Sequence, residues 1–226
     1  MKAMLLAAGR GRRMGALTQK RPKPLLPAGG QPLIVRHLER LAAVGIREVI
    51  INLSWQGQRL RAALGDGSRW DLVLQYSDEG DTALETAGGI IKALPMLGPE
   101  PFLVVNGDIV TDHPLVLAPL ETDLLGRLVL VDNPAHHRSG DYGLRDGCVV
   151  DAAPRLTFSG ISLLSPELFE GLAPGIRPLA KVFAPAIAAG RLAGEHHQGY
   201  WSDAGTPARL AAADRWVRGR AGATMG

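Results

Sequence analysis

The sequence predicts an α/β fold in which a mixed, mostly parallel sheet is flanked by helices. Two observations support this prediction. Short apolar runs alternate with segments of helical periodicity over the first half of the chain, and the apolar runs are continuous, as in strands that are covered on both faces. The 226 residues, of which 46% are hydrophobic and 21% charged, are enough to bury a substantial core.

The first half contains four expected strands and three expected helices. The strands are expected at 1–8, 48–53, 72–76 and 102–105, and the helices at 32–44, 56–64 and 86–94. Gly45 suits the end of the first helix, and Pro95 is expected to stop the third. Because consecutive parallel strands are joined by right-handed crossovers, all four strands are expected in one sheet.

The second half has fewer helical segments. Strands are expected at 128–131, 148–150 and 158–164, and helices at 178–189 and 207–218. Thr206 is placed as the N-cap of the last helix, with Pro207 at its first position. Because helices are sparse between residues 125 and 165, an insertion or an antiparallel section on the sheet is expected there. The chain has no internal repeat and no low-complexity linker, so a single domain over 1–226 is the simplest prediction.

The segment 5–27 combines the end of a strand, several glycines and many basic side chains. Gly9 and Gly11 directly follow the first apolar run, and no acidic residue occurs before Glu39. Glycine lets a ligand approach the backbone, and clustered Arg and Lys give a phosphate charge-assisted donors. The segment therefore predicts a polyphosphate-binding loop, with a solvated basic face as the alternative.

Several other classes of protein are disfavoured. A dinucleotide-binding fingerprint would need a third glycine where Met14 stands, which argues against a nicotinamide or flavin enzyme. The net charge is only +3 and no aromatic residue precedes Trp55, which argues against a nucleic-acid partner. The single Cys148 excludes an intrachain disulfide. The apolar run 3–8 is too short for a signal peptide or a membrane span, so a cytoplasmic protein with no membrane partner is expected.

Two loop carboxylates indicate a metal site. Asp108 follows an apolar strand and Gly107, and Asp203 lies just upstream of the last expected helix. Mg²⁺ prefers one or two carboxylates together with phosphate oxygens. A turn-forming role for Asp108 and a loop position near a helix N-terminus for Asp203 are the alternatives. With the basic loop, the two carboxylates indicate Mg²⁺-assisted chemistry on a nucleoside triphosphate.

Four motifs, in order and spacing, resemble those of the sugar-1-phosphate nucleotidylyltransferases. They are Leu-Ala-Ala-Gly-x-Gly-x-Arg-Met at 6–14 with Pro-Lys-Pro-Leu at 22–25, Leu-Glu-Thr-Ala-Gly-Gly at 84–89, Asn-Gly-Asp at 106–108, and Trp-x-Asp-x-Gly-Thr at 201–206. The resemblance implies a Rossmann-like nucleotide-diphospho-sugar transferase fold without the C-terminal β-helix of longer relatives. It also implies that residues 1–110 bind the nucleotide and residues 111–226 the sugar.

Within that family, the chain is most similar to the short N-acetylmuramate α-1-phosphate uridylyltransferases of peptidoglycan recycling. The stretches 131–137, 140–141, 156–162 and 194–196 carry this likeness. Ala16 stands where the family usually has proline, Ala204 replaces a larger residue, and the Glu-Lys-Pro sugar motif of many relatives is not present around 150–154. The likeness implies UTP and a sugar-1-phosphate as partners of a monomer or small homo-oligomer.

The resemblance also implies a set of site residues. Arg13 and Lys23 would be catalytic, and Asp108 and Asp203 would hold Mg²⁺. The nucleotide would be bound by Ala8, Gly9, Gly11, Arg13, Lys23, Glu79, Thr86 and Ala87. The sugar would be bound by Glu85, Asn106, Asp141, Gly143, Thr157 and Ser159, with His137 and Arg138 as candidates for the lactyl carboxylate of a muramyl sugar.

Two alternatives remain open. The shared motifs bind triphosphate and metal and do not select the base or the sugar, so a guanylyl- or thymidylyltransferase acting on mannose- or glucose-1-phosphate is one alternative. A non-catalytic nucleotide-sugar sensor on the same fold is the other. The presence of Arg13, Lys23, Asp108 and Asp203 together argues against a sensor, which has no need of the full set.

Overall fold

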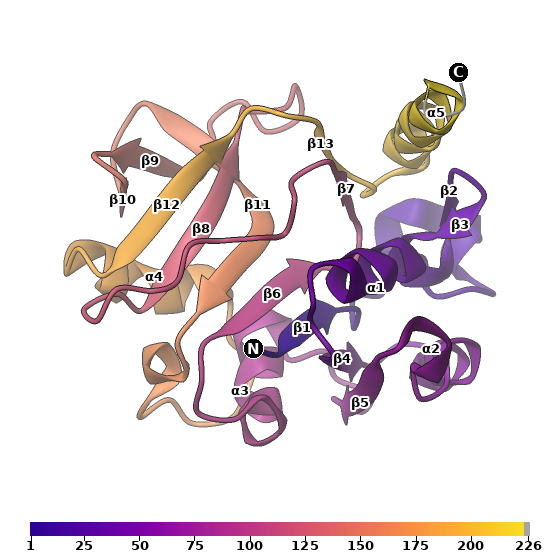
Figure 1. Cartoon of the computed structure of the whole chain (residues 1–226), viewed down its shortest axis with the longest axis horizontal. Coiled ribbons are helices and arrows are strands. Elements are labelled where there is room, and N and C mark those ends of the chain that lie inside the picture. Colours follow the sequence, from indigo (N-terminus) through magenta and orange to yellow (C-terminus); the bar gives the residue numbers. More distant parts are fainter. Residues whose placement is uncertain (224–226) are drawn as a thin grey trace.

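A nine-stranded mixed sheet organises the computed structural model, which describes the backbone of residues 1–223 and the side chains of residues 1–220. Its strands are β1 (Ala3–Leu6), β4 (Glu48–Leu53), β5 (Val73–Asp78), β6 (Phe102–Asn106), β8 (Gly126–Val131), β9 (Tyr142–Arg145), β10 (Cys148–Val150), β11 (Arg155–Leu164) and β12 (Leu192–His197). Their spatial order is β5-β4-β1-β6-β11-β8-β12-β10-β9. Figure 1 shows this sheet passing from β5 at the bottom to β9 and β10 at the upper left.

The first four predicted strands form the parallel half of this sheet. β1 pairs in parallel with β4 and β6, and β4 pairs in parallel with β5. β11 then runs antiparallel to β6 and β8, and β9 and β10 form an antiparallel edge. The predicted mixed, mostly parallel α/β sheet with an antiparallel section after residue 125 is therefore confirmed. No β-helix occurs within residues 1–223.

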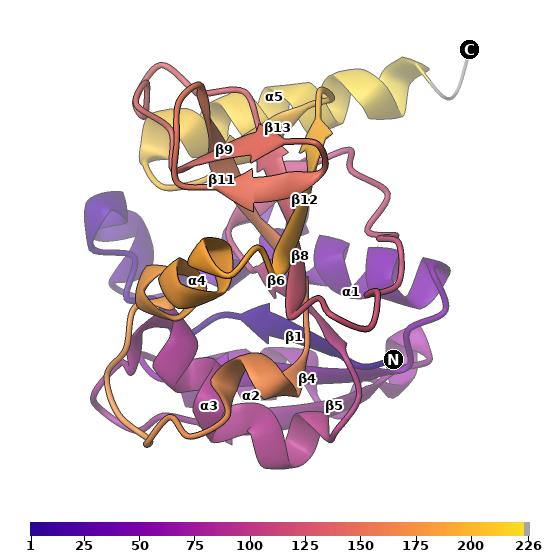
Figure 2. The same cartoon turned by 90° about the vertical axis from the view of Figure 1, so that its left-hand side faces the viewer.

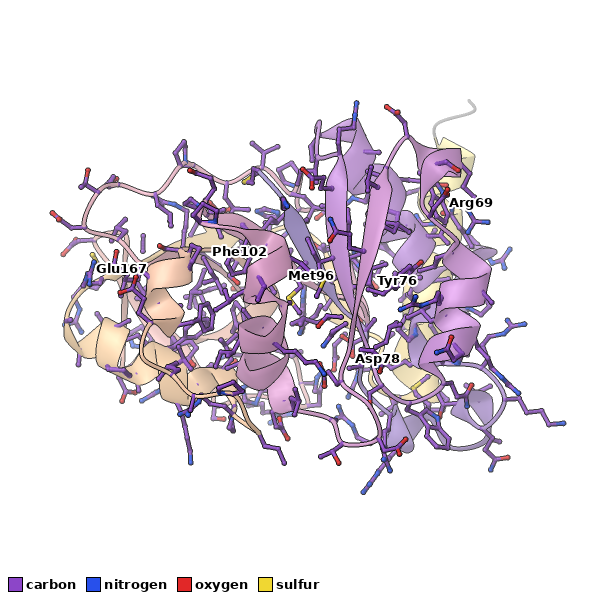
Figure 3. All side chains as sticks on the ribbon, turned by 90° about the horizontal axis from the view of Figure 1, so that it is seen from below. Arg69, Tyr76, Asp78, Met96, Phe102 and Glu167 are labelled. Carbon is purple, nitrogen blue, oxygen red and sulfur yellow. The ribbon has the colours of Figure 1, made fainter. Side chains whose placement is uncertain are left out.

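Helices cover both faces of the sheet. They are α1 (Leu33–Ala43), α2 (Gly57–Leu64), α3 (Glu85–Leu97), α4 (Leu179–Ala188) and α5 (Pro207–Ala223). α1 and α2 bury their apolar sides on one face, and α3 and α4 on the other, so the core lies in two layers. In Figure 3, Phe102 and Met96 lie with α3 and α4, whereas Tyr76 and Arg69 lie toward α2. No helix in the described part is both long and apolar enough to span a membrane.

The C-terminal helix α5 packs away from the large sheet, against β2 (Pro27–Ala28), which pairs with β3 (Gln31–Pro32). Figures 1 and 2 show it lying across that end of the molecule. The backbone N–H of Gly29 donates to Asp214 Oδ1 at 2.7 Å, and the rings of Tyr200 and Trp216 stack with centroids 3.9 Å apart. These contacts join the two ends of the chain beside the basic loop.

Some predicted boundaries were wrong. Pro95 does not stop α3, because it lies in the last turn, where its missing N–H removes only one helical hydrogen bond. The helix ends instead at Gly98, which has φ 86° and whose N–H donates to Leu94 O at 2.9 Å. The strand expected at 72–76 runs to Asp78. Strands β9, β12, β7 (Ile109–Thr111) and β13 (Trp201–Asp203) were not predicted.

His37 on α1 makes the stability of the protein depend on pH. The side chain is 2% exposed and neither ring nitrogen has a hydrogen bond in the described residues. Burial, followed by the positive charge of Arg40, lowers the pKa of His37 from 6.5 to about 4. The unfolded chain therefore binds the extra proton first as the pH falls, so stability present above pH 6.5 is lost toward pH 4.

We expect the wild-type protein to lose roughly 2–3 kcal/mol of unfolding free energy through His37 between pH 7.5 and pH 4.5. His37→Leu removes the titrating group and keeps an apolar side chain of similar size. Urea denaturation of both proteins at the two pH values measures the difference. The same pH dependence in both proteins would show that His37 does not supply it.

Candidate active site

A cleft of about 310 Å³ opens beyond the carboxyl ends of the parallel strands. It is lined by Leu6, Ala7, Ala8, Gly9, Lys23, Pro24, Asn52, Glu79, Ala83, Glu85, Thr86, Asn106, Gly107 and Asp108. These residues follow β1, β4, β5 and β6, whose ends meet at the same edge of the sheet. This is the position in which open α/β sheets bind ligands.

Asn52 and Glu79 hold the strand ends together at the floor of the cleft. The N–H of Ala7 donates to Asn52 Oδ1 at 2.6 Å, and Asn52 Nδ2 donates to Glu79 Oε1 at 2.7 Å. Glu79 Oε2 accepts the N–H of Leu84 at 2.8 Å. Both polar side chains are buried, so the carboxylate of Glu79 joins the loop after β1 to the start of α3. Asn52 was not among the predicted site residues: it lies within β4, and its contacts with Ala7 and Glu79 form only in the folded protein.

Lys23 brings a buried positive charge to the cleft. Its side chain is 9% exposed, and its ammonium group is paired with Asp108 at the end of β6. Gly11 has φ 62°, and a Cβ there would lie 3.0 Å from Thr18 and 3.2 Å from the Cβ of Lys23. Glycine therefore permits both the left-handed turn and the close approach of the Lys23 stem.

Arg13 lies on the exposed 3₁₀ segment Arg12–Thr18, outside the wall of the cleft. Its guanidinium group has no hydrogen bond and no ion pair among the described residues. Ala87 is fully buried in α3 and does not line the cleft. The other predicted nucleotide residues surround the cleft, except Gly11, which supports Lys23 from behind.

Asp203 is brought to the same region by the two-stranded pairing of β7 with β13. The N–H of Ala204 donates to the backbone oxygen of Asp108 at 2.7 Å, so the two predicted metal ligands lie on paired segments. Arg209 holds Asp203 through Nη2–Oδ2 at 3.0 Å and Nε–Oδ1 at 2.9 Å. His136 Nε2 lies 3.2 Å from the same Oδ1.

The chemistry of this pair fits a cation. Asp203 Oδ1 is buried, and neither nearby nitrogen has hydrogen-bond geometry toward it, so a carboxylate oxygen is left without a hydrogen bond. No group of three or more His, Cys, Asp or Glu side chains in the described part could hold a metal. A cation at Asp108 and Asp203 would therefore complete its coordination with ligand oxygens or water, as Mg²⁺ commonly does.

The predicted sugar residues fall into two groups. Glu85 and Asn106 line the cleft, and Glu85 has φ 62°, a left-handed conformation that costs energy for a residue with a Cβ. The predicted sugar-binding residues from the second half of the chain do not line the cleft; they are Asp141, Gly143, Thr157, Ser159, His137 and Arg138.

Several of these second-half residues already have partners. Asp141 accepts from the backbone N–H of Phe158 at 2.8 Å and lies 2.9 Å from His137 Nε2. Thr157 donates to Asn133 at 2.8 Å, and Ser159 is 1% exposed. Gly143 is buried and Arg138 is exposed. Their assignment to the sugar stays a prediction.

The fold and the cleft define a nucleotide-binding α/β enzyme whose cleft pairs a glycine-rich basic loop with carboxylates. A model of the nucleotidyl transferase family matches residues 2–144, and the chain belongs to this family. The family predicted from the motifs, an enzyme of the nucleotidyltransferase class, is thus confirmed.

The similar proteins span the whole chain. It is 46% identical over 220 residues to the N-acetylmuramate alpha-1-phosphate uridylyltransferase of Neisseria meningitidis, covering 93% of this chain and 95% of that protein. It is 33% identical over 234 residues to the protein of the same name from Caulobacter vibrioides, covering 94% and 96%. A solved putative glucose-1-phosphate thymidylyltransferase from Bacillus anthracis, in complex with a sucrose, superposes with a TM-score of 0.85 at 21% identity, covering 96% and 95%, and supports the fold.

Removing Asn52 tests the floor of the cleft. Asn52→Ala leaves the N–H of Ala7 and a carboxylate oxygen of Glu79 without partners in a buried site, and we expect it to lower the unfolding free energy by about 2–4 kcal/mol. The matched control is Ser54→Ala, because Ser54 Oγ donates to Gly80 O at 2.9 Å in an exposed setting. Urea denaturation should show a change below about 1 kcal/mol for the control. Equal losses in both variants would contradict the special role of Asn52.

Proposed function

We propose that this protein transfers a uridylyl group from UTP to N-acetylmuramate α-1-phosphate, giving UDP-N-acetylmuramate and pyrophosphate, as a step of peptidoglycan recycling. The observation that carries this proposal is the cleft at the ends of β1, β4 and β6, where the glycine loop presents Lys23 to Asp108. The full-length similarity to proteins named for this activity supports the choice of substrates. On this proposal the protein acts in the cytoplasm as a monomer or a small homo-oligomer.

The reaction needs placement and charge compensation more than proton transfer. An oxygen of the sugar phosphate attacks the α-phosphorus of UTP, the bond from that phosphorus to the bridging oxygen breaks, and pyrophosphate leaves. The nucleophile is already an anion, so no strong general base is required. Phosphoryl-type transfer is catalysed mainly by positioning and electrostatic stabilisation.

The basic loop would divide this work between two side chains. Arg13, whose guanidinium has no partner within the described residues, would bind the β- and γ-phosphates that leave as pyrophosphate. The ammonium of Lys23 reaches the cleft from within the protein and would bind the α-phosphate and the incoming phosphate. Backbone groups of Ala8 and Gly9 line the cleft and would support the base.

Asp108 and Asp203 would hold Mg²⁺, the cofactor that the family implies. When bound, Mg²⁺ supplies charge compensation for the phosphates. Asp203 Oδ1, which accepts no hydrogen bond, and the half-exposed carboxylate of Asp108 are the groups that would receive it. Arg209 fixes the position of the Asp203 carboxylate from behind.

The sugar would occupy the side of the cleft formed by Glu85 and Asn106. Both line the cleft, and both can hydrogen-bond hydroxyl or acetamido groups. On this assignment residues 1–110 bind chiefly the nucleotide and residues 111–226 chiefly the sugar. The second part would contribute Asp141, Gly143, Thr157, Ser159, His137 and Arg138.

A substrate panel decides between this function and its alternatives. Five nucleoside triphosphates are combined with four sugar-1-phosphates, with Mg²⁺ or with EDTA, and pyrophosphate release is measured. We expect the fastest turnover with UTP and N-acetylmuramate α-1-phosphate, and none with EDTA. A preference for GTP or dTTP with mannose- or glucose-1-phosphate would identify the protein as a guanylyl- or thymidylyltransferase. No pyrophosphate release with any pair of substrates would favour the non-catalytic sensor.

Lys23 is expected to be essential for turnover. Lys23→Met keeps an apolar stem and removes the charge, and we expect kcat/KM to fall by about 100- to 1,000-fold because one electrostatic contact to the reacting phosphates is lost. Lys20→Met is the matched control, since Lys20 is exposed in the same loop. Circular dichroism verifies the fold of both variants. Full activity of Lys23→Met would remove this residue from the mechanism.

A further inference from the structure

Arg177 is a half-buried arginine without an acceptor. Its Nε is buried, and neither a hydrogen bond nor an ion pair reaches its guanidinium among the described residues. The other half-buried arginines of that part all have carbonyl, amide or carboxylate partners: Arg36, Arg40, Arg127, Arg155, Arg191 and Arg209. A buried donor left unpaired costs about 1–3 kcal/mol, so a native structure that keeps one calls for an explanation.

The backbone of Arg177 is fixed against the wall of the cleft. Its N–H donates to Leu84 O at 3.0 Å, and its carbonyl oxygen accepts the N–H of Ala87 at 3.0 Å. A Cβ on Gly88 would lie 2.2 Å from the backbone oxygen of Gly175, so glycine allows this close contact. Arg177 is thus attached on both sides of Glu85 and Thr86, which line the cleft.

Arg177 lies on a different segment from the basic loop and beside Glu85, which the proposed function assigns to the sugar. The cations expected to bind the triphosphate, Arg13 and Lys23, belong to the segment after β1, whereas Arg177 precedes α4. Glu85, its neighbour across the contact, also lines the cleft and does not pair with it. Arg177 does not itself line the cleft, but its backbone is bound to the segment that presents Glu85 and Thr86 there, and its guanidinium has no anionic partner among the described residues.

A muramyl sugar carries an anion that would match this charge. Beyond its phosphate it has a lactyl carboxylate, which a planar guanidinium binds with paired N–H donors. His137 is already engaged with Asp141 at 2.9 Å, and Arg138 is exposed, whereas Arg177 is half-buried; like Arg138, it does not itself line the cleft. Arg177 needs no broken contact in order to bind.

We propose that Arg177 binds the lactyl carboxylate of the sugar substrate and thereby selects muramyl over glucosaminyl phosphates. This inference rests on the proposed function, because it assumes a carboxylate-bearing sugar. It assigns no chemical step to Arg177. Arg177 would contribute to substrate selection, because its guanidinium would bind the lactyl carboxylate equally in the ground state and in the transition state.

The test compares two substrates that differ in the lactyl group. Arg177→Gln, Arg177→Lys and the wild-type enzyme are assayed with UTP and either N-acetylmuramate α-1-phosphate or N-acetylglucosamine-1-phosphate, the latter scored as a competitive inhibitor if its turnover is slow. We expect Arg177→Gln to lose about 10- to 100-fold in kcat/KM for the muramyl substrate, mainly through KM, and less than about threefold for the other. Arg177→Lys should be intermediate, because it keeps the charge without the paired donors.

The controls separate this role from others. Arg145→Gln changes an exposed arginine of β9 and should leave both substrates unaffected. Equal losses on both substrates would indicate phosphate binding or a structural role for Arg177 and overturn the inference, as would unchanged kinetics. If only Arg138→Gln loses activity selectively on the muramyl substrate, the lactyl carboxylate is bound by Arg138 and not by Arg177. A wild-type enzyme inactive on the muramyl substrate would reject the proposed function itself, whereas an active one unaffected by Arg177→Gln rejects only the inference.

Discussion

The cleft depends on the pairing of Lys23 with Asp108. A buried ammonium group is costly unless a carboxylate or phosphate is close to it, so the pair holds the basic loop on the end of β6 while no ligand is present. The turn at Gly11 and the hydrogen bond from Thr18 Oγ1 to Gly11 O, 3.1 Å long, fix the loop from the other side. On the proposed function, the same ammonium would gain a second acceptor when phosphates enter the cleft, without having to be brought in from solvent.

A second constraint connects this pair to the far end of the chain. The β7–β13 pairing aligns Asp203 with Ile109, next to Asp108, and α5 begins four residues later at Pro207. Arg209 in the first turn of α5 then holds the Asp203 carboxylate. Because α5 is anchored on Gly29 by Asp214, the proposed metal ligands and the end of the basic loop are supported by a common helix. Displacement of α5 would therefore disturb both ends of the site at once.

The parallel half of the sheet was predictable because β1 and β6 are continuous apolar runs that end at a glycine or a polar residue, and β4 and β5 each contain a run of apolar residues. β12 was not predicted because its second half, Glu195 to His197, is polar. Its pairing with β8 also depends on contacts between residues 66 positions apart in the chain, such as Leu192 with Gly126. The cleft residues with family motifs were accessible from the sequence. Asn52, His136 and Arg177 could not be predicted as site residues from the sequence. Asn52 and His136 matter through contacts with residues distant in the chain, and Arg177 through the lack of a hydrogen-bond acceptor.

Charge distribution gives a physical reason why related enzymes can keep one reaction and change the sugar. On the proposed function, the triphosphate would be bound by cations from a single short segment, Arg13 and Lys23, and these would serve any nucleoside triphosphate. The sugar side is assembled from elements that contact each other only in the folded protein: the first turn of α3 and the residues before α4. A substitution at Arg177 changes the charge offered to the sugar while Lys23, Asp108 and Asp203 keep their contacts. On the proposed function, sugar selection can then diverge without loss of the phosphate chemistry, because the two sets of charges lie on separate segments of the chain.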